Sequence, residues 1–106
     1  MKQLSQKLEI LSQKLQTGFV TSAEAQALED VRGYANANRI EYGPHARLRM
    51  RERRVSREDV LSALVMATSC QAEPDDRWKV LGVDTSGDDL TVIVVIEDGV
   101  VVVTLF

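Results

Sequence analysis

Two nearly uninterrupted apolar runs near the end of the sequence limit how the chain can fold. They read LTVIVVIE at residues 90–97 and VVVVTLF at residues 100–106, and Asp98-Gly99 lies between them. β-Branched runs on either side of an Asp-Gly pair predict two antiparallel strands joined by a hairpin. Because almost every position is apolar, both faces of this sheet should be covered. We expect helices from residues 44–68 on one face, and an N-terminal helical hairpin or a second subunit on the other.

The residues before these runs extend the predicted sheet. Residues 78–83 (WKVLGV) alternate in the manner of a strand, and Glu73-Pro74-Asp75-Asp76 before them is turn-forming. Together these segments predict an antiparallel β-meander of three or four strands. Residues 39–43 (RIEYG) also alternate and predict one short strand earlier in the chain.

Two helices are expected between the short strand and the meander. Pro44 suits the first turn of a helix that should run to about Arg54, because its missing N–H needs no partner there. Ser56, with Asp59 three residues later, is typical of a helix cap. The helix that Ser56 starts should end near Thr68.

The first 38 residues predict a helical hairpin. An apolar stripe at helical spacing is formed by Leu4, Leu8, Leu11 and Leu15. The sequence Thr21-Ser-Ala-Glu24 has the form of a capping box that would start a second helix. We therefore expect one compact α+β protein, with residues 1–38 as an N-terminal helical hairpin extension and residues 39–106 as the α+β domain.

Composition and cysteine content narrow the class of protein. A chain of 106 residues with 44% hydrophobic and 27% charged residues is typical of one soluble domain. Cys70 and His45 are the only residues of their types, so we expect no disulfide, no closed zinc site and no other cofactor. The sequence has no signal-peptide core and no run of about eighteen apolar residues. We expect a cytoplasmic protein without membrane contact.

Residues 44–59 (PHARLRMRERRVSRED) form a basic segment on an otherwise acidic chain. Their six Arg residues outweigh three carboxylates by +3, whereas the whole chain carries −3, so the other residues sum to −6. A basic element on an acidic body can attract an anionic ligand or an acidic protein. The alternative is a solvated helix face, and we expect Arg51, Arg54 and Arg57 to be solvated.

The same segment resembles the bacterial domain of unknown function family 4258. The resemblance rests on a His-Ala start, an Arg-Met pair, a later Arg, a Val-Ser pair and an Asp-Val helix start, here His45-Ala46, Arg49-Met50, Arg53, Val55-Ser56 and Asp59-Val60. It covers about residues 39–106. That family is similar to the small RelE-like and ParE-like ribonuclease toxins of bacterial toxin–antitoxin systems. The resemblance therefore implies a RelE-like fold, RNA cleavage and an antitoxin protein as partner.

Metal-free RNA cleavage needs groups that transfer protons and cations that stabilise the developing phosphorane charge. His45, Arg49 and Arg53 recur every four residues, so they would share one face of a helix. The imidazole could act as base or acid, and the two guanidinium groups could hold the phosphate. Arg77 and Lys79 on a predicted strand are candidate substrate-binding cations. For the second proton-transfer group, the sequence leaves open Tyr42, Glu97 and Thr104.

Two functional hypotheses follow from these residues. The first is a RelE-like toxin that acts as a metal-independent ribonuclease and is inhibited by an antitoxin. The second is a non-catalytic module that binds RNA or an acidic protein through its arginines and forms a homodimer through its N-terminal helices. A purely structural role is the alternative for the individual residues, in which His45 caps backbone groups and Arg49 and Arg53 pair with carboxylates.

Overall fold

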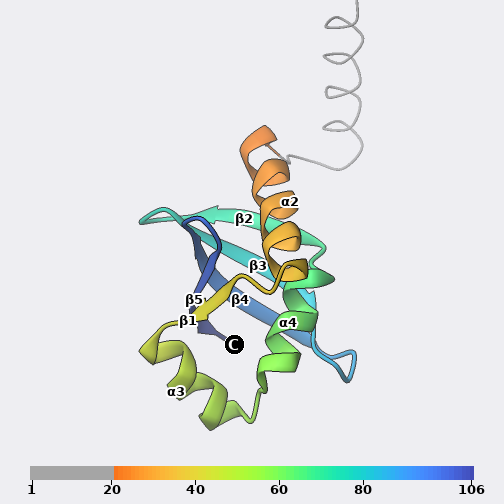
Figure 1. Cartoon of the computed structure of the whole chain (residues 1–106), viewed down its shortest axis with the longest axis vertical. Coiled ribbons are helices and arrows are strands. Elements are labelled where there is room, and N and C mark those ends of the chain that lie inside the picture. Colours follow the sequence, from red (N-terminus) through yellow and green to blue (C-terminus); the bar gives the residue numbers. More distant parts are fainter. Residues whose placement is uncertain (1–20) are drawn as a thin grey trace, which may run out of the picture.

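The computed structural model describes residues 21–106, which form three helices and one five-stranded sheet (Figure 1). The predicted α+β class is confirmed. The elements in chain order are α2 (Ser22–Asn36), β1 (Ile40–Tyr42), α3 (Pro44–Arg53), α4 (Arg57–Val65), β2 (Ser69–Glu73), β3 (Arg77–Val83), β4 (Asp89–Ile96) and β5 (Val100–Leu105).

The sheet is mixed rather than purely antiparallel. Its strand order is β1-β5-β4-β3-β2, and the strands from β2 to β5 pair antiparallel with their neighbours in the chain. β1 pairs parallel with β5, with Ile40 opposite Val100, and Gly43 N donates to Val102 O at 2.9 Å just beyond the strand. The region of the predicted antiparallel meander holds the four antiparallel strands β2 to β5, and the predicted short strand is β1, whose parallel pairing with β5 the sequence did not indicate.

The helix that Ser56 starts ends three residues before the predicted end near Thr68. α4 ends at Val65. Thr68 N donates to Leu81 O at 2.9 Å, so at Thr68 the backbone is already hydrogen-bonded to β3. The next residues form β2 (SCQAE), in which only Cys70 is buried. Pairing with β3, rather than an apolar pattern of its own, makes this polar segment a strand.

The helices begin where the sequence predicts. Thr21 Oγ1 accepts the N–H of Glu24 at 3.0 Å, and the Glu24 carboxylate accepts the N–H of Thr21 at 3.3 Å, which completes a capping box. Ser56 and Asp59 make the same exchange at the start of α4. Pro44 occupies the first turn of α3. These signals act over three or four residues, so the sequence alone is enough to place them.

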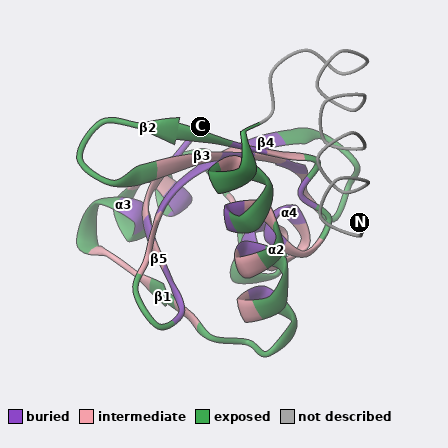
Figure 2. Cartoon of the chain, turned by 90° about the horizontal axis from the view of Figure 1, so that it is seen from above, coloured by how far each residue is buried: buried purple, intermediate pink, exposed green. Residues whose placement is uncertain are grey.

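All three helices pack on the same face of the sheet. One core combines Val31 of α2, Ala46 of α3 and Val60 of α4 with Val80, Val92 and Val102 of the strands. Figure 2 shows α2 and α4 on the same side of β3 and β4. The backbones come closest at Gly82, where an added Cβ would lie 2.0 Å from the carbonyl oxygen of Ala63. The expectation that the helical hairpin covers the other face is therefore wrong for α2.

The opposite face of the sheet is formed by the alternate residues of the same strands. At its centre are Leu81, Ile93, Val95 and Val101. Within residues 21–106, these side chains are not part of the core, and of the four only Ile93 is buried. The predicted first helix of the hairpin, which carries the leucine stripe, lies outside the described residues. The homodimer expected through the N-terminal helices stays a prediction.

Candidate functional site

The three residues of the predicted catalytic set lie on α3. His45 and Arg53 are exposed, whereas Arg49 is partly buried. The Nε of Arg49 donates to Leu105 O at 3.4 Å, and its Nη1 lies 3.8 Å from Oε1 of Glu52. The helix keeps the predicted spacing, but Arg49 also attaches α3 to the end of β5.

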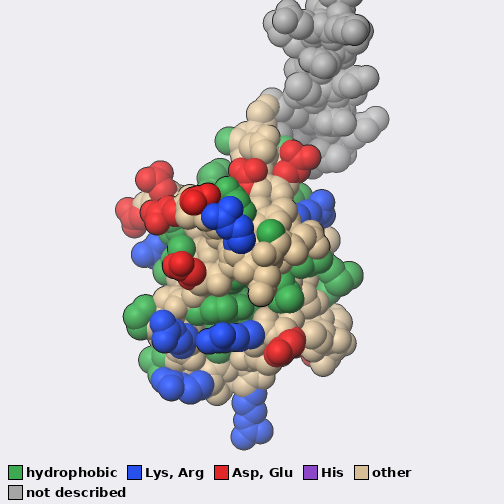
Figure 3. Space-filling model, viewed as in Figure 1, with side chains coloured by type: hydrophobic (Ala, Val, Ile, Leu, Met, Phe, Trp, Pro, Cys, Tyr) green, Lys and Arg blue, Asp and Glu red, His purple; other side chains and the backbone are tan. Residues whose placement is uncertain are grey.

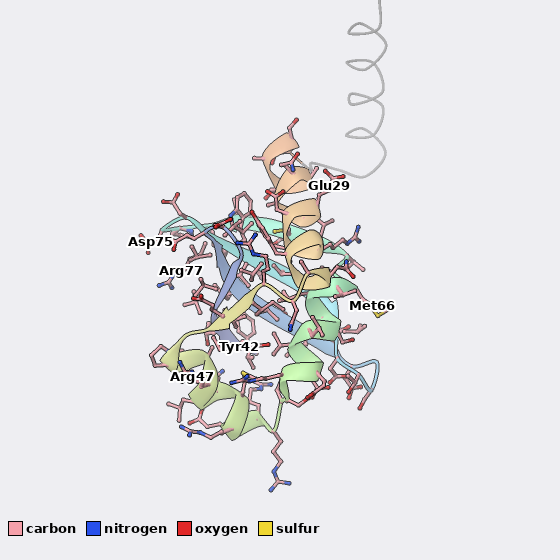
Figure 4. All side chains as sticks on the ribbon, viewed as in Figure 1. Glu29, Tyr42, Arg47, Met66, Asp75 and Arg77 are labelled. Atoms are coloured by element: carbon pink, nitrogen blue, oxygen red, sulfur yellow. The ribbon has the colours of Figure 1, made fainter. Side chains whose placement is uncertain are left out.

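The two predicted substrate-binding cations, Arg77 and Lys79, lie on β3. They alternate with Trp78 and Val80, which pack in or against the core, so their side chains leave the sheet on the opposite face. α3 packs on β5, and β4 separates β5 from β3. Figure 4 shows Arg77 beside the β2–β3 turn, away from α3. The structure therefore does not bring Arg77 and Lys79 together with His45.

An open cleft lies between α3 and the start of α4, and its lining does not include His45, Arg49 or Arg53. It has a volume of about 540 Å³ and is lined by Tyr42, Arg47, Met50, Arg51, Arg54, Val55, Ser56 and Arg57. We call it the arginine cleft. Within the described chain, its lining contains no Asp or Glu. Figure 3 shows Lys and Arg side chains gathered over α3, while most of the visible carboxylates lie toward the other end of the molecule.

Tyr42 forms the aromatic part of the arginine cleft. It is the last residue of β1 and faces the core side of the sheet, and Figure 4 shows it between α3 and α4. Arg47 Nε donates to Tyr42 O at 3.1 Å, and the guanidinium of Arg57 lies 5.3 Å from the centroid of the Tyr42 ring. Burial raises the pKa of the Tyr42 hydroxyl, while the Arg57 charge acts in the opposite direction. Two arginines from different helices thus contact Tyr42, Arg47 at its backbone carbonyl and Arg57 at its ring.

The turn between α3 and α4 places another arginine at the cleft. Arg54 caps α3 in the left-handed conformation, with φ 55° and ψ 44°, a region that glycine and asparagine adopt more easily. Val55 N then donates to Met50 O at 2.8 Å, which closes the turn. This turn brings Val55 beside Met50 at the apolar floor and leaves the Arg54 side chain exposed at the rim.

The first turn of α4 is attached to the β3–β4 loop through Asp59. Its Oδ1 accepts hydrogen bonds from the N–H and the hydroxyl of Thr85, at 3.1 and 2.5 Å, and its Oδ2 accepts the N–H of Ser56 at 3.0 Å. These bonds, the Thr85 hydroxyl first, hold the pKa of Asp59 well below its usual range. Because Arg57 lies between Ser56 and Asp59, the same network fixes the backbone that carries Arg57 over Tyr42.

Neither a metal site nor a membrane-spanning helix is found in residues 21–106. No group of three or more His, Cys, Asp or Glu side chains in this range is arranged to hold a metal ion. None of its helices combines the length and the apolar character needed to cross a lipid bilayer. The lining of the arginine cleft itself offers guanidinium groups, one phenol ring, the Ser56 hydroxyl and an apolar floor.

The sequence did not predict the arginine cleft. We expected Arg51, Arg54 and Arg57 to be solvated, and all three are exposed. In the structure they also line one cleft together with Arg47. A partial signal exists, because residues 47, 51 and 54 have the i, i+4, i+7 spacing of one helix face. The contribution of Arg57 and Tyr42 depends on how three separate elements pack.

The fold and the cleft define a small α+β domain with a concentrated cationic surface. Residues 42–106, more than half of the chain, match the family model described as a domain of unknown function (DUF4258). The chain belongs to this family, as the residues from His45 to Val60 predict. No curated protein and no solved structure matches the chain.

Proposed function

We propose that this protein binds RNA through the arginine cleft. The observation that carries the proposal is the convergence of four arginines on a single open cleft with an apolar floor and a half-buried tyrosine. Guanidinium groups bind phosphates in bidentate fashion and also stack on bases, so they serve both parts of a nucleotide. Within residues 21–106, the lining contains no Asp or Glu that would pair with these cations in place of a ligand.

The charge distribution supports a local site rather than general affinity for polyanions. The chain has a formal charge of −3, so non-specific attraction to RNA by the whole molecule is unfavourable. Four arginines within one cleft reverse this locally, and they release counterions when they contact phosphates. Binding should therefore depend strongly on these four residues and steeply on salt.

The proposal is tested by the affinity for a fluorescently labelled single-stranded RNA, measured by anisotropy. The double variant Arg51→Ala/Arg54→Ala removes two charges from the cleft. A matched control, Arg39→Ala/Arg77→Ala, removes two charges from exposed positions outside it. We expect the first variant to weaken binding at least tenfold and the control less than threefold. The salt slope of the first should fall by roughly 0.7 for each phosphate that the variant can no longer bind.

Two results would contradict RNA binding at this cleft. Equal reductions of affinity in the two double variants would mean that net charge, and not the cleft, determines affinity. No measurable binding by the unmodified protein would reject the function itself. Tight binding of an acidic peptide, with no binding of RNA, would instead make the cleft a protein-binding site.

A ribonuclease of the RelE-like toxin type is a second candidate function. The exposed His45 lies one helical turn from Arg49 on the helix that also carries the arginine cleft. His45 and Arg49 lie outside the lining of the cleft, so only a strand that continues from the cleft around α3 would reach this imidazole and guanidinium, which are groups able to transfer a proton and to stabilise phosphorane charge. Such a toxin would have an antitoxin protein as its partner.

Cleavage is tested separately from binding. Purified protein is incubated with labelled RNA, its production is induced in growing bacteria, and His45→Ala is compared with the unmodified protein in both assays. A ribonuclease predicts shortened RNA and arrested growth, both relieved by His45→Ala. Intact RNA with undiminished binding would reject cleavage and leave the binding function in place.

A further inference from the structure

The wall of the arginine cleft contains a cation stacked on an aromatic ring. The Arg57 guanidinium lies 5.3 Å from the Tyr42 centroid, within the range of a cation–π contact. The backbone of Tyr42 is held as well, because Arg47 Nε donates to its carbonyl oxygen at 3.1 Å. Arg57 is exposed and Tyr42 is half-buried, so the planar group lies toward the solvent and the ring toward the core.

We propose that the arginine cleft selects single-stranded RNA by seating one unpaired base on the Arg57–Tyr42 pair. This inference rests on the proposed RNA binding and names the form of RNA that the cleft takes. The base would stack on the planar guanidinium, while Arg47, Arg51 and Arg54 pair with the phosphates on either side of it. Stacking on aromatic rings and on guanidinium planes is the usual means by which proteins hold unpaired bases.

The lining of the cleft favours a base over a bare phosphate. Met50 is buried, and with the partly buried Val55 it gives the cleft an apolar floor. A phosphate gains nothing from such a floor, whereas the face of a base does. The volume of about 540 Å³ also lies within the 300 to 1,000 Å³ that is typical of pockets for small ligands, and exceeds the needs of one phosphate.

A paired base cannot use this arrangement. In an A-form duplex, each base is covered by its neighbours on both faces, and side chains reach mainly phosphates and 2′-hydroxyls. A duplex could still contact the exposed arginines at the rim, but its bases could not reach the Arg57–Tyr42 pair. The structure therefore predicts a preference for unpaired strands that charge alone would not produce.

The attachment of α4 keeps the stack in place before any ligand binds. Asp59 accepts hydrogen bonds from both Ser56 and Thr85. These bonds hold the backbone of the first turn of α4, which begins with Arg57. A prepared stacking surface binds at lower entropic cost than one that must be ordered by its ligand. This explains why an exposed arginine can act as a specific contact and not only as a diffuse charge.

The experiment compares three RNA ligands of equal length and two conservative variants. The ligands are a single strand, a duplex of the same sequence and a single strand with abasic sites, which keeps the phosphates but lacks bases. Arg57→Lys keeps the charge and loses the planar group. Arg39→Lys makes the same chemical change at an arginine–tyrosine pair outside the arginine cleft, where the Arg39 guanidinium lies 5.5 Å from the centroid of the Tyr34 ring. Circular dichroism of each variant confirms that it is folded.

We expect the unmodified protein to bind the single strand at least tenfold more tightly than the duplex or the abasic strand. Arg57→Lys should weaken binding of the single strand about tenfold and leave the duplex unchanged, whereas Arg39→Lys should change either less than threefold. Equal affinity for the three ligands, or no effect of Arg57→Lys, would overturn base seating while RNA binding stands. Failure to bind any of the three would reject the proposed function as well.

Discussion

The carboxylate of Asp59 accepts two hydrogen bonds from Thr85, one from its N–H at 3.1 Å and one from its hydroxyl at 2.5 Å. Asp59 is the third residue of α4, and Thr85 lies in the loop between β3 and β4. Since the same carboxylate also accepts the N–H of Ser56, one side chain joins a helix cap to the far end of a hairpin. This contact adds to the core packing of Val60, Ala63 and Leu64 in attaching α4, whose first residue lines the arginine cleft, to the sheet.

Stability should therefore fall in acid partly through Asp59. Its pKa in the folded protein lies below the value of about 3.9 for an unfolded chain, so its contribution is complete above pH 4 and is lost as the pH falls further. We expect Asp59→Asn to lower the melting temperature at pH 7. The gap between variant and unmodified protein should narrow from pH 4 to pH 3. A gap that stays constant over this range would show that the charge of Asp59 does not contribute.

Gly82 should be intolerant of any side chain. An added Cβ would lie 2.0 Å from the Ala63 carbonyl oxygen and 2.7 Å from its carbonyl carbon, and these backbone atoms cannot rotate away. Gly82→Ala should destabilise the protein by about 3 kcal/mol, the upper part of the range for overpacked cores. Urea unfolding measures this change directly.

The matched control for Gly82 is Gly33, in the exposed face of α2. A Cβ at Gly33 would have no atom within 4 Å, and alanine is a better helix former than glycine. Gly33→Ala should therefore stabilise the protein by about 0.5 to 1 kcal/mol. If both substitutions destabilised the protein equally, close packing of α4 on β3 would not be the reason.

The sequence predicted those parts of the fold that depend on neighbouring residues. The capping boxes at Thr21 and Ser56 and the Asp98-Gly99 connection are local, and each lies where it was predicted. β2 was missed because its polar residues become a strand only through pairing with β3. The coverage of one face was misjudged because Gly82 lets α4 approach the sheet closely, and α2 packs beside α4 on that same face.

The candidate site shows the same division between local and distant information. Helical periodicity correctly put His45, Arg49 and Arg53 in one helix. It carries no information on which other elements pack on either side of that helix. The arginine cleft needs a left-handed residue at Arg54 to turn the chain toward α4. It also needs Tyr42, which the parallel pairing of β1 with β5 places beside that turn. Neither requirement is visible in a spacing pattern.

Cys70 should react slowly with thiol reagents in the folded protein. Burial first, and then the nearby Glu24 carboxylate, raise the pKa of the thiol to about 11. At pH 8, roughly one thiol in a thousand is then ionised, and the thiolate is the reactive form. Modification by an aromatic disulfide reagent should be at least tenfold slower than for free cysteine and should become fast in denaturant. Because Cys70 is the only cysteine, an equally fast reaction of the native protein would directly contradict its burial.

Arg54 should show a conflict between stability and binding. Its left-handed backbone, with φ 55°, is unfavourable for a residue with a side chain, and glycine removes that strain. Arg54→Gly should therefore raise the free energy of unfolding by about 1 kcal/mol, as measured in urea. The same substitution removes one cation from the arginine cleft, so the affinity for single-stranded RNA should fall severalfold. Stability and affinity thus change in opposite directions.

Arg54→Lys separates the two effects. Lysine keeps the charge at the rim of the cleft and meets the same backbone strain as arginine, so stability should be unchanged and affinity should fall less than threefold. A gain in stability for Arg54→Gly without a fall in affinity would remove Arg54 from the proposed phosphate contacts. A decrease in both stability and affinity would show instead that the arginine side chain holds the α3–α4 turn together. Selection for binding explains an arginine at this position only if stability rises while affinity falls.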